Sequence, residues 1–180
     1  MHYDKRIPGN KIYLRNVEID DCNERYLSWL NDPDVNRYLE TRHTPQTDNT
    51  IRQYVSAELS STDSYLLAII DNNTDEHVGN IRLSSINRIH LTAEIAIVIG
   101  DKNCWGKGFG TEAYSLLLGF AFEVLGLHKC TLGVIASNAA GIKVVEKAGF
   151  QLEGVLKEQV FTDTSNRDDV YRYGIINRSI

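Results

Sequence analysis

Three glycines at alternate positions, Gly106, Gly108 and Gly110, constrain the fold of this chain more than any other feature of its sequence. An apolar run, residues 93–99, precedes them and a strongly helical run follows, so the segment predicts a strand, a glycine turn and a helix. Glycines leave the backbone N–H groups of the turn unshielded, and the positive end of the helix dipole lies at the same place. The turn is therefore expected to bind an anion, most commonly phosphate.

Two common nucleotide-binding motifs do not fit this turn. A Rossmann fingerprint needs glycine where Thr111 stands. A P-loop needs Ser or Thr directly after Lys107, where Gly108 stands. Neither motif is therefore present.

Further motifs follow the turn in a fixed order. The run W-G-K-G-x-G-T-E-A starts at Trp105, L-G-L occupies residues 125–127, Asn138 follows the next expected strand, and E-K-x-G-F occupies residues 146–150. In this order the motifs resemble the acetyl-CoA signature of the GNAT superfamily of N-acetyltransferases, and in detail its RimJ/RimL-like branch. Trp105 stands at the usual Gln or Arg position. The resemblance is specific over residues 92–156 and loose before them.

Alternating strand and helix patterns predict an α/β or α+β protein with helices on both faces of a sheet. No repeat, linker or low-complexity tract interrupts the sequence, so one domain is expected over residues 1–180. The resemblance implies the GNAT fold, a mixed, mostly antiparallel sheet flanked by helices. It also implies that the sheet splays between the strand ending at Ile99 and the strand starting at Lys129, and that the pantetheine arm of the cofactor enters there.

Hydrophobic periodicity places the individual elements. Strands are expected over residues 11–18, 64–70, 78–87, 91–99, 129–136, 150–161 and 170–176. A first helix should start at Asp20 or Asp21, and a second should cover residues 47–59. Asn138 should cap a short helix that ends at Gly149. The helix after the glycine turn should face the sheet with Ala113, Leu116, Leu117, Phe120, Ala121 and Val124.

The overall charge argues against two classes of partner. The 180 residues carry a formal net charge of −5, whereas binding to nucleic acid or to an anionic membrane needs a basic surface. No run approaches the ~18 apolar residues of a membrane span, and residues 1–9 contain no apolar stretch of the kind found in signal peptides. A cytoplasmic protein is therefore expected, as a monomer or homodimer.

The cysteines indicate neither a disulfide nor a metal site. Cys22, Cys104 and Cys130 are far apart and form no C-x-x-C pair, so no disulfide, zinc site or other metal ion is expected. Histidines at positions 2, 77, 90 and 128 show no ligand spacing. They are expected on the surface or hydrogen-bonded within the fold.

An acetyl-CoA site is implied by the resemblance. The N–H groups of the glycine turn would bind the diphosphate, and in the family the strand before the splay offers main-chain hydrogen bonds to the pantetheine and, near Ile97, to the oxyanion. Lysines 102, 107, 143 and 147 lie near the two helix starts in the sequence and either meet phosphates or are ordinary solvated residues. The residues expected to bind the cofactor are Ile97, Val98, Ile99, Trp105, Gly106, Lys107, Gly108, Phe109, Gly110, Thr111, Asn138 and Lys143.

Acetyl transfer to an amine also needs a neutral amine and a proton for the departing thiolate, and Glu94 and Ser137 are the catalytic candidates. Glu94 lies in an otherwise apolar strand, where burial would raise its pKa and suit it to accept a proton through water. RimJ/RimL-like enzymes have a proposed acidic base at this point; the alternative is a structural carboxylate paired with Arg82. The family's usual Tyr acid is replaced by Val145, so Ser137, Asn138 or a water molecule is left to supply the proton.

The resemblance also implies where the acceptor amine binds. Family members build its pocket from the first two helices and the loop between them, here residues 29–43, plus the loop near residues 162–167. Part of this segment resembles enzymes that acetylate amino groups on nucleotide-linked sugars. Arg37, Arg42 and His43 would suit a substrate phosphate and Glu40 an amine, and a solvated loop of mixed charge is the alternative. The candidate substrate-binding residues are Asn36, Arg37, Tyr38 and Glu40.

Taken together, these features predict an acetyl-CoA-dependent N-acetyltransferase that modifies a primary amine of a small molecule, with an amino sugar or a nucleotide-linked amino sugar favoured. A protein N-terminus, as in ribosomal-protein acetylation, and a polyamine are alternative acceptors. A non-catalytic acyl-CoA-binding module is the alternative from another class. The replacement of the usual Tyr by Val145 is the feature that favours such a module.

Overall fold

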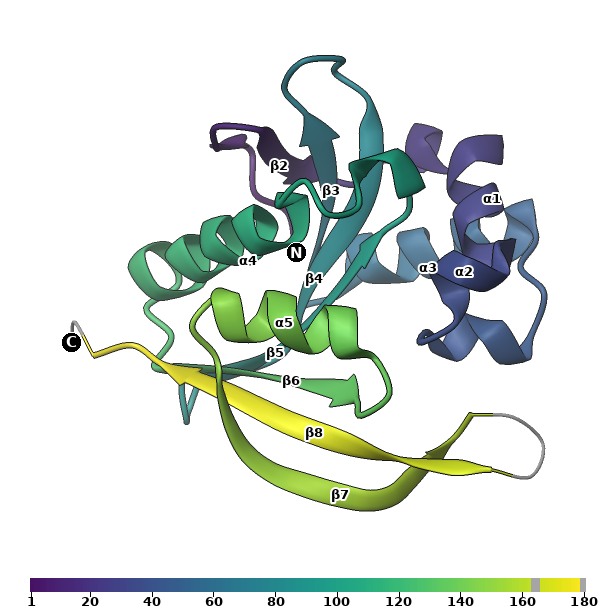
Figure 1. Ribbon diagram of the computed structural model, residues 1–180. Helices are drawn as coiled ribbons and strands as arrows, with labels where there is room; N and C mark the ends of the chain where they lie inside the picture. Colours follow the sequence, from purple (N-terminus) through teal and green to yellow (C-terminus); the bar gives the residue numbers. More distant parts are fainter. Residues whose placement is uncertain (163–165, 179–180) are drawn as a thin grey trace.

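An eight-stranded sheet forms the centre of the fold in the computed structural model, which describes residues 1–162 and 166–178 (Figure 1). The strands are β1 (Ile7–Pro8), β2 (Ile12–Asn16), β3 (Tyr65–Asp71), β4 (His77–Asn87), β5 (Thr92–Ile99), β6 (Lys129–Ile135), β7 (Gln151–Phe161) and β8 (Arg167–Ile176). Their order across the sheet is β1-β2-β3-β4-β5-β6-β8-β7. Neighbours are antiparallel except β5 and β6, so the predicted mixed, mostly antiparallel sheet is confirmed.

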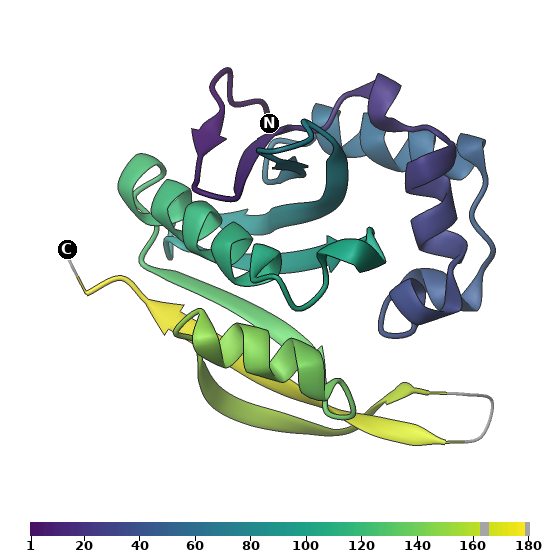
Figure 2. The same cartoon turned by 45° about the horizontal axis from the view of Figure 1, so that its top comes forward.

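Helices cover both faces of this sheet, as predicted (Figure 2). One face carries α1 (Glu24–Asn31), α2 (Pro33–Asn36) and α3 (Asp48–Ser60), and the other carries α4 (Phe109–Gly119) and α5 (Ala139–Lys147). The short helical segments are η1 (Ile19–Asp21), η2 (Glu40–His43), η3 (Lys102–Cys104) and the π-helical η4 (Phe120–Val124), which continues α4. The segment from α1 to η2 thus includes two short helices, α2 and η2, that the sequence pattern did not predict.

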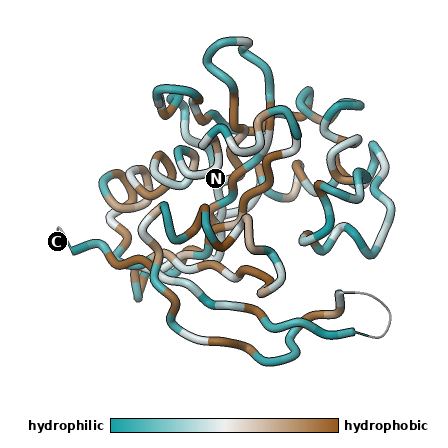
Figure 3. The backbone as a smooth tube through the Cα atoms, viewed as in Figure 1, coloured by the Kyte–Doolittle hydropathy of each residue, from teal (hydrophilic) through white to brown (hydrophobic). Residues whose placement is uncertain are grey.

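Strand β3 contributes to the core on both faces of the sheet. Its side chains alternate between the faces and are nearly all buried. Leu67 and Ile69 belong to the cluster that includes α4, whereas Leu66 and Ile70 belong to the cluster that includes α1 and α3. Figure 3 shows hydrophobic residues along the central strands and hydrophilic ones in the outer loops. Because both faces are covered, this strand reads as a continuous apolar run.

The first helix starts later than the sequence predicted. Asn23 caps α1, because its side chain accepts hydrogen bonds from two N–H groups of the first turn. Asp20 and Asp21 belong instead to η1. Asp21 is held by Arg15, whose guanidinium reaches both carboxylate oxygens at 2.7 Å. The prediction of a cap at Asp20 or Asp21 was therefore wrong, since a strong ion pair engages one of them.

The helix after the glycine turn also differs at its end. Its predicted inward-facing residues are buried or partly buried up to Ala121, but Val124 is exposed. From Phe120 onward the backbone is π-helical. A π turn takes more residues than an α turn, so the side chain of Val124 no longer falls on the face that an α-helical repeat predicts.

The boundaries around α5 follow the prediction. The Asn138 side chain accepts a hydrogen bond from the Gly141 N–H at 2.9 Å and caps the helix. Gly149 follows the helix with φ of 95°, the left-handed conformation expected at C′. Strand β8 starts at Arg167, three residues before the predicted Val170, because the hairpin with β7 extends that far.

Trp29 fixes α1 to the end of β5. Its ring lies directly on Gly100, so closely that a Cβ atom at Gly100 would overlap it. His77 packs edge-on against the same ring with 5.1 Å between centroids, and burial lowers the pKa of this histidine. The chain runs from α1 straight into α2 and η2. This contact therefore determines where the predicted acceptor segment lies.

The substitution Gly100→Ala is expected to lower the free energy of unfolding by about 1–3 kcal/mol, because the new methyl group pushes Trp29 out of its place. Urea denaturation measures this change. Gly119→Ala is the matched control: Gly119 is helical and a Cβ atom there meets nothing within 4 Å. Gly119→Ala should raise the free energy of unfolding by about 0.5–1 kcal/mol. Equal effects at the two positions would contradict the assignment of Gly100 as a packing constraint.

Candidate active site

The sheet opens between β5 and β6. These strands pair only from Thr92 with Lys129 to Glu94 with Thr131, although β5 continues to Ile99 and β6 to Ile135. Figures 1 and 2 show the two strands diverging beyond this point. The edge of β5 that faces β6 therefore has no strand partner in the described sheet after Glu94. This is the predicted splay, and its peptide groups are available to a ligand.

Side chains along the opening point in two directions. Ile97 and Ile99 pack against the cluster on the α4 side, and Val98 packs against the cluster on the α1 side. The carbonyl of Ile99 already accepts a hydrogen bond from the indole Nε1 of Trp105 at 2.8 Å. Of the three predicted main-chain contacts in β5, the one at the Ile99 carbonyl is thus already made within the chain.

The glycine turn has the backbone that an anion site needs. Gly106 and Gly108 have φ of 73° and 87°, conformations that favour glycine, and α4 begins at Phe109. The first helical N–H with a partner in this helix is that of Glu112, which donates to the Gly108 carbonyl at 3.0 Å. The N–H groups before it lie at the helix start without intrahelical acceptors. The side chain of Phe109 is buried, so only its main chain could meet a ligand.

The second half of α5 lies beside the start of α4. A Cβ atom on Gly110 would approach Val144 of α5 to 3.3 Å, so the two helices meet closely at the opening. Lys143 and Lys147 are exposed on α5. Lys107 is exposed within the turn.

Lys102 does not belong with these lysines. Its ammonium lies 2.6 Å from the Asp32 carboxylate and 3.1 Å from the Asp34 carboxylate, which lowers the pKa of Asp32 and raises that of Lys102. Lys102 is therefore engaged by two carboxylates of the chain. It ties the turn after β5 to the start of α2.

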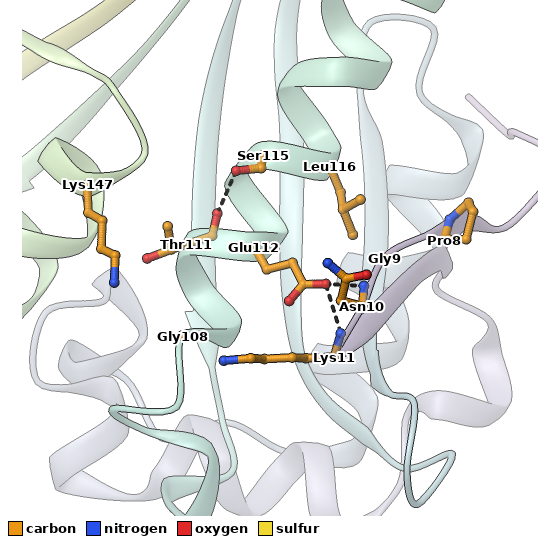
Figure 4. A pocket seen from close by; sticks show the side chains of 10 residues that line it. All are labelled: Pro8, Gly9, Asn10, Lys11, Gly108, Thr111, Glu112, Ser115, Leu116 and Lys147. Atoms are coloured by element: carbon orange, nitrogen blue, oxygen red, sulfur yellow. Dashed lines mark hydrogen bonds between the residues drawn. The ribbon is translucent and has the colours of Figure 1, made fainter.

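A pocket of about 520 Å³ lies between the β1–β2 turn and the start of α4 (Figure 4). Lys11 and Lys147 approach its α4 wall from opposite sides in this view. Glu112 is held by the N–H groups of Asn10 and Lys11, and the Lys11 ammonium donates to the Lys107 carbonyl at 2.7 Å. Lys11 was not predicted, because its position depends on a contact with residues nearly a hundred positions away.

Glu94 lies on the other face of the sheet, where the helices on the α1 side leave it uncovered. Its side chain is 49% exposed and lies 2.6 Å from the Arg172 guanidinium. The prediction that Glu94 is buried was wrong, because it alternates with the buried residues Ala93 and Ile95 and no helix covers its face. The suggested partner was also wrong: Arg82 pairs with Glu58 at 2.7 Å. Glu94 is thus an open carboxylate at the edge of the splay.

Ser137 and Tyr38 meet at the end of β6. The Ser137 N–H donates to the Asp168 carboxylate at 3.0 Å, and the hydrogen bond from its side chain lowers the pKa of Asp168. The Tyr38 hydroxyl donates to the Ser137 carbonyl at 3.1 Å. The predicted acid Ser137 therefore lies beside a carboxylate.

The other candidate acceptor residues divide into two kinds. Asn36 donates to the Leu30 carbonyl at 2.9 Å and supports the turn after α1. The Arg37 guanidinium lies 5.7 Å from the centre of the Tyr38 ring, and Glu40 is exposed at the start of η2. Residues 163–165 of the predicted acceptor loop lie outside the described residues. Arg37, Tyr38 and Glu40 thus remain accessible for a substrate.

Arg172, Asp168 and Glu58 are polar residues of this face that sequence reasoning missed. Arg172 and Asp168 lie on β8 and contact Glu94 and Ser137. Glu58 lies on α3 and contacts Arg82. The alternation of charged with apolar residues in β8 was the available signal. It gives no indication of which strand the charges will meet.

Comparisons with known proteins agree with this geometry. Residues 11–151 match the family described as acetyltransferase (GNAT) domain. The chain is 30% identical over 173 residues to an uncharacterized N-acetyltransferase, p20, of Bacillus licheniformis, covering 93% of this chain and 94% of p20. The chain belongs to the GNAT acetyltransferase family. Acetyl-CoA is the acetyl donor of this family, and the predicted GNAT fold is confirmed.

Two further relatives have named substrates. A spermidine N(1)-acetyltransferase of Escherichia coli K12 is 35% identical over 95 residues, covering 53% of this chain and 50% of that protein. The structure of a spermidine N-acetyltransferase from Vibrio cholerae in complex with CoA and spermine is similar with a TM-score of 0.83 and 25% identity, covering 93% of this chain and 96% of the other. Relatives of this acetyltransferase thus include enzymes of small-molecule amines.

Three further observations concern metal ions, membrane spans and the cysteines. Among the described residues, no group of three or more His, Cys, Asp and Glu side chains is arranged to hold a metal ion. In the same part of the chain, no helix combines the length and apolar character needed to cross a bilayer. The three cysteines are buried free thiols, and burial raises the pKa of each.

In this acetyltransferase, Glu94→Gln is expected to lower kcat/KM about 10²-fold, because a general base would lose its proton acceptor. Arg172→Gln, which keeps the carboxylate and removes its partner, should change the rate less than about tenfold. Initial rates of thiol release measure both. The free energy of unfolding should change by no more than about 1 kcal/mol in either variant, since the ion pair is exposed. Equal losses of activity would favour a structural pair, and full turnover of Glu94→Gln at every pH would exclude Glu94 as base.

Proposed function

We propose that this chain transfers the acetyl group of acetyl-CoA to a primary amine of a small molecule, and that amino sugars or nucleotide-linked amino sugars are the first class of acceptor. The observation that carries the proposal is the opening between β5 and β6, with the glycine turn at one end and an uncovered polar sheet face beside it. When bound, acetyl-CoA supplies an activated acyl thioester. The residues described below would hold it and orient the amine.

The fit to coenzyme A rests on the free main-chain groups of the opening. N–H groups at the start of α4 would hold the diphosphate, and the peptide groups of Ile97 would meet the pantetheine or the oxyanion. Trp105 would keep the turn in place through its hydrogen bond to Ile99. Asn138 would act mainly by capping α5. These roles extend the RimJ/RimL-like resemblance, which remains part of the proposal.

We also assign Lys11 and Lys147 to the cofactor, through its 3′-phosphate. Both line the pocket beside α4, and neither has a carboxylate partner among the described residues. Two ammonium groups around a pocket next to a helix start favour an anion there. The diphosphate would then occupy the turn and the 3′-phosphate this pocket.

The charges on the acceptor face favour an amino sugar over a polyamine. Two acidic side chains of this face are paired with arginines, Glu94 with Arg172 at 2.6 Å and Glu58 with Arg82 at 2.7 Å, whereas Glu40 is exposed at the start of η2. A polyamine carries several positive charges and is best met by unpaired carboxylates. Arg37 and Arg172 would in addition suit a substrate phosphate.

Polyamine acetylation is the second candidate, because the chain is similar to spermidine acetyltransferases. A protein N-terminus is the third, in line with the RimJ/RimL-like motifs. The alternative from another class is a module that binds acyl-CoA without transfer. The exposed Glu94 beside the splay counts against a silent module, since a carboxylate there is available to an incoming amine.

The test is release of free thiol from acetyl-CoA with a panel of amino sugars, their nucleotide conjugates, polyamines and short peptides. Turnover is expected to be highest for an amino sugar. A preference for spermidine or for a peptide would refute the proposed acceptor class but would still support acetyltransferase activity. Binding of CoA without thiol release on any amine would leave the non-catalytic module.

Lys11→Ala and Lys147→Ala should each weaken CoA binding about fivefold while leaving the affinity for 3′-dephospho-CoA unchanged, since a partly exposed ion pair contributes about 1 kcal/mol. Calorimetry with the two ligands measures the difference. Lys102→Ala is the matched control, because Lys102 is engaged by Asp32 and Asp34. Equal losses for both ligands would place the 3′-phosphate elsewhere.

A further inference from the structure

The reaction needs a proton donor that the familiar position does not supply. When the C–S bond of the donor breaks, the sulfur leaves as a thiolate, and a proton delivered to it lowers the barrier. Val145 occupies the usual place of the acid, is 1% exposed and packs in the core. Any acid must therefore come from another element. This inference rests on the proposed function.

The two residues that the sequence offered besides water have other partners. Ser137 lies against the Asp168 carboxylate: its N–H donates to this carboxylate at 3.0 Å, and its side chain lowers the pKa of Asp168. The Asn138 side chain accepts the Gly141 N–H as the cap of α5, and an amide has no acidic proton to give. Neither residue is suited to protonate a thiolate.

The Tyr38 hydroxyl lies at the mouth of the opening. It donates to the Ser137 carbonyl at 3.1 Å, just past the end of β6. The last strand pair of the opening is Glu94 with Thr131. Gly100, just after β5, and Ser137, just after β6, are equally many residues beyond this pair. Tyr38 follows α2, whose predecessor α1 is fixed to Gly100 by Trp29. The segment that carries Tyr38 therefore spans the mouth from one arm to the other.

Both Arg37 and solvent lie close to Tyr38. The Arg37 guanidinium lies 5.7 Å from the ring centre. The side chain is only half-buried, so water can return the proton after each turnover. A second bridge, from the Arg42 guanidinium to the Phe161 carbonyl at 2.7 Å, holds the same segment against β7.

We infer that Tyr38 is the general acid of the acetyl transfer. Its O–H bond breaks as the sulfur takes the electron pair of the C–S bond, the phenol proton forms the S–H bond, and the phenolate takes a proton from water. The amine nitrogen forms the new amide bond and loses its proton to Glu94, the candidate base. A tyrosine from the segment after α2 thus replaces the acid missing from α5.

The first experiment measures binding rather than turnover. A donor at Tyr38 stabilises the thiolate of bound CoA, so the thiolate should appear at lower pH in the wild-type complex than in the complex with Tyr38→Phe. Titration of thiolate absorbance with CoA bound gives both curves. Coincident curves would overturn the inference. This experiment keeps its meaning even where no amine acceptor has been identified.

The second experiment compares two acetyl donors that differ only at the leaving atom. Tyr38→Phe should lower kcat about 10²-fold with acetyl-CoA, with KM for acetyl-CoA unchanged. With the selenoester analogue the loss should be less than about fivefold, because a selenolate leaves readily without a proton. Phe keeps the ring and its packing.

The control for a purely structural role is Arg42→Gln, which removes the other bridge of the same segment. It should change the rates with both donors by the same factor. Equal losses with both donors in Tyr38→Phe would make Tyr38 a bridge only and overturn its role as acid. Absence of turnover in the wild type on every amine would instead refute the proposed function, with the thiolate titration still deciding on Tyr38.

Discussion

The early end of the pairing between β5 and β6 is the constraint on which the rest of the site depends. Two parallel strands that stayed paired would satisfy each other's peptide groups and close the sheet. Here the pairing ends at Glu94 and Thr131, and the peptide groups of β5 beyond it need other partners. Leaving such groups unsatisfied is costly. The opening therefore favours a ligand with amide groups of its own, and the pantetheine arm of CoA has two.

Contacts at the ends of the two arms keep the opening in place. On the β5 arm, Trp105 binds the carbonyl of Ile99 and Trp29 covers Gly100. On the β6 arm, the Ser137 N–H is held by Asp168, so that the end of this strand stays with β8. Each arm is thus completed by its own neighbours. A site that exists before its ligand arrives loses less entropy on binding.

Local features of the sequence were sufficient for the framework of the site and insufficient for its polar contacts. Positive φ at Gly106 and Gly108, the cap at Asn138 and the strand before the turn depend on neighbouring residues, and each was predictable. The exposure of Glu94 depends on which sheet face the helices leave uncovered, and its pairing with Arg172 depends on the order of β6 and β8. Such information is carried by the packing of distant elements, which periodicity does not encode.

In the proposed reaction, positioning rather than burial of charge would promote acetyl transfer. Glu94 reaches the opening from β5 and Tyr38 from the segment after α2, and both side chains remain in contact with solvent. Desolvation therefore adds little to their chemistry before the acceptor binds. Most of the proposed rate enhancement would then come from orientation of the amine against the thioester and from hydrogen bonds donated by the unpaired main chain of β5. An acceptor that fills the polar face would exclude the remaining water and strengthen both. The shape of the acceptor thus contributes to the rate as well as to the affinity.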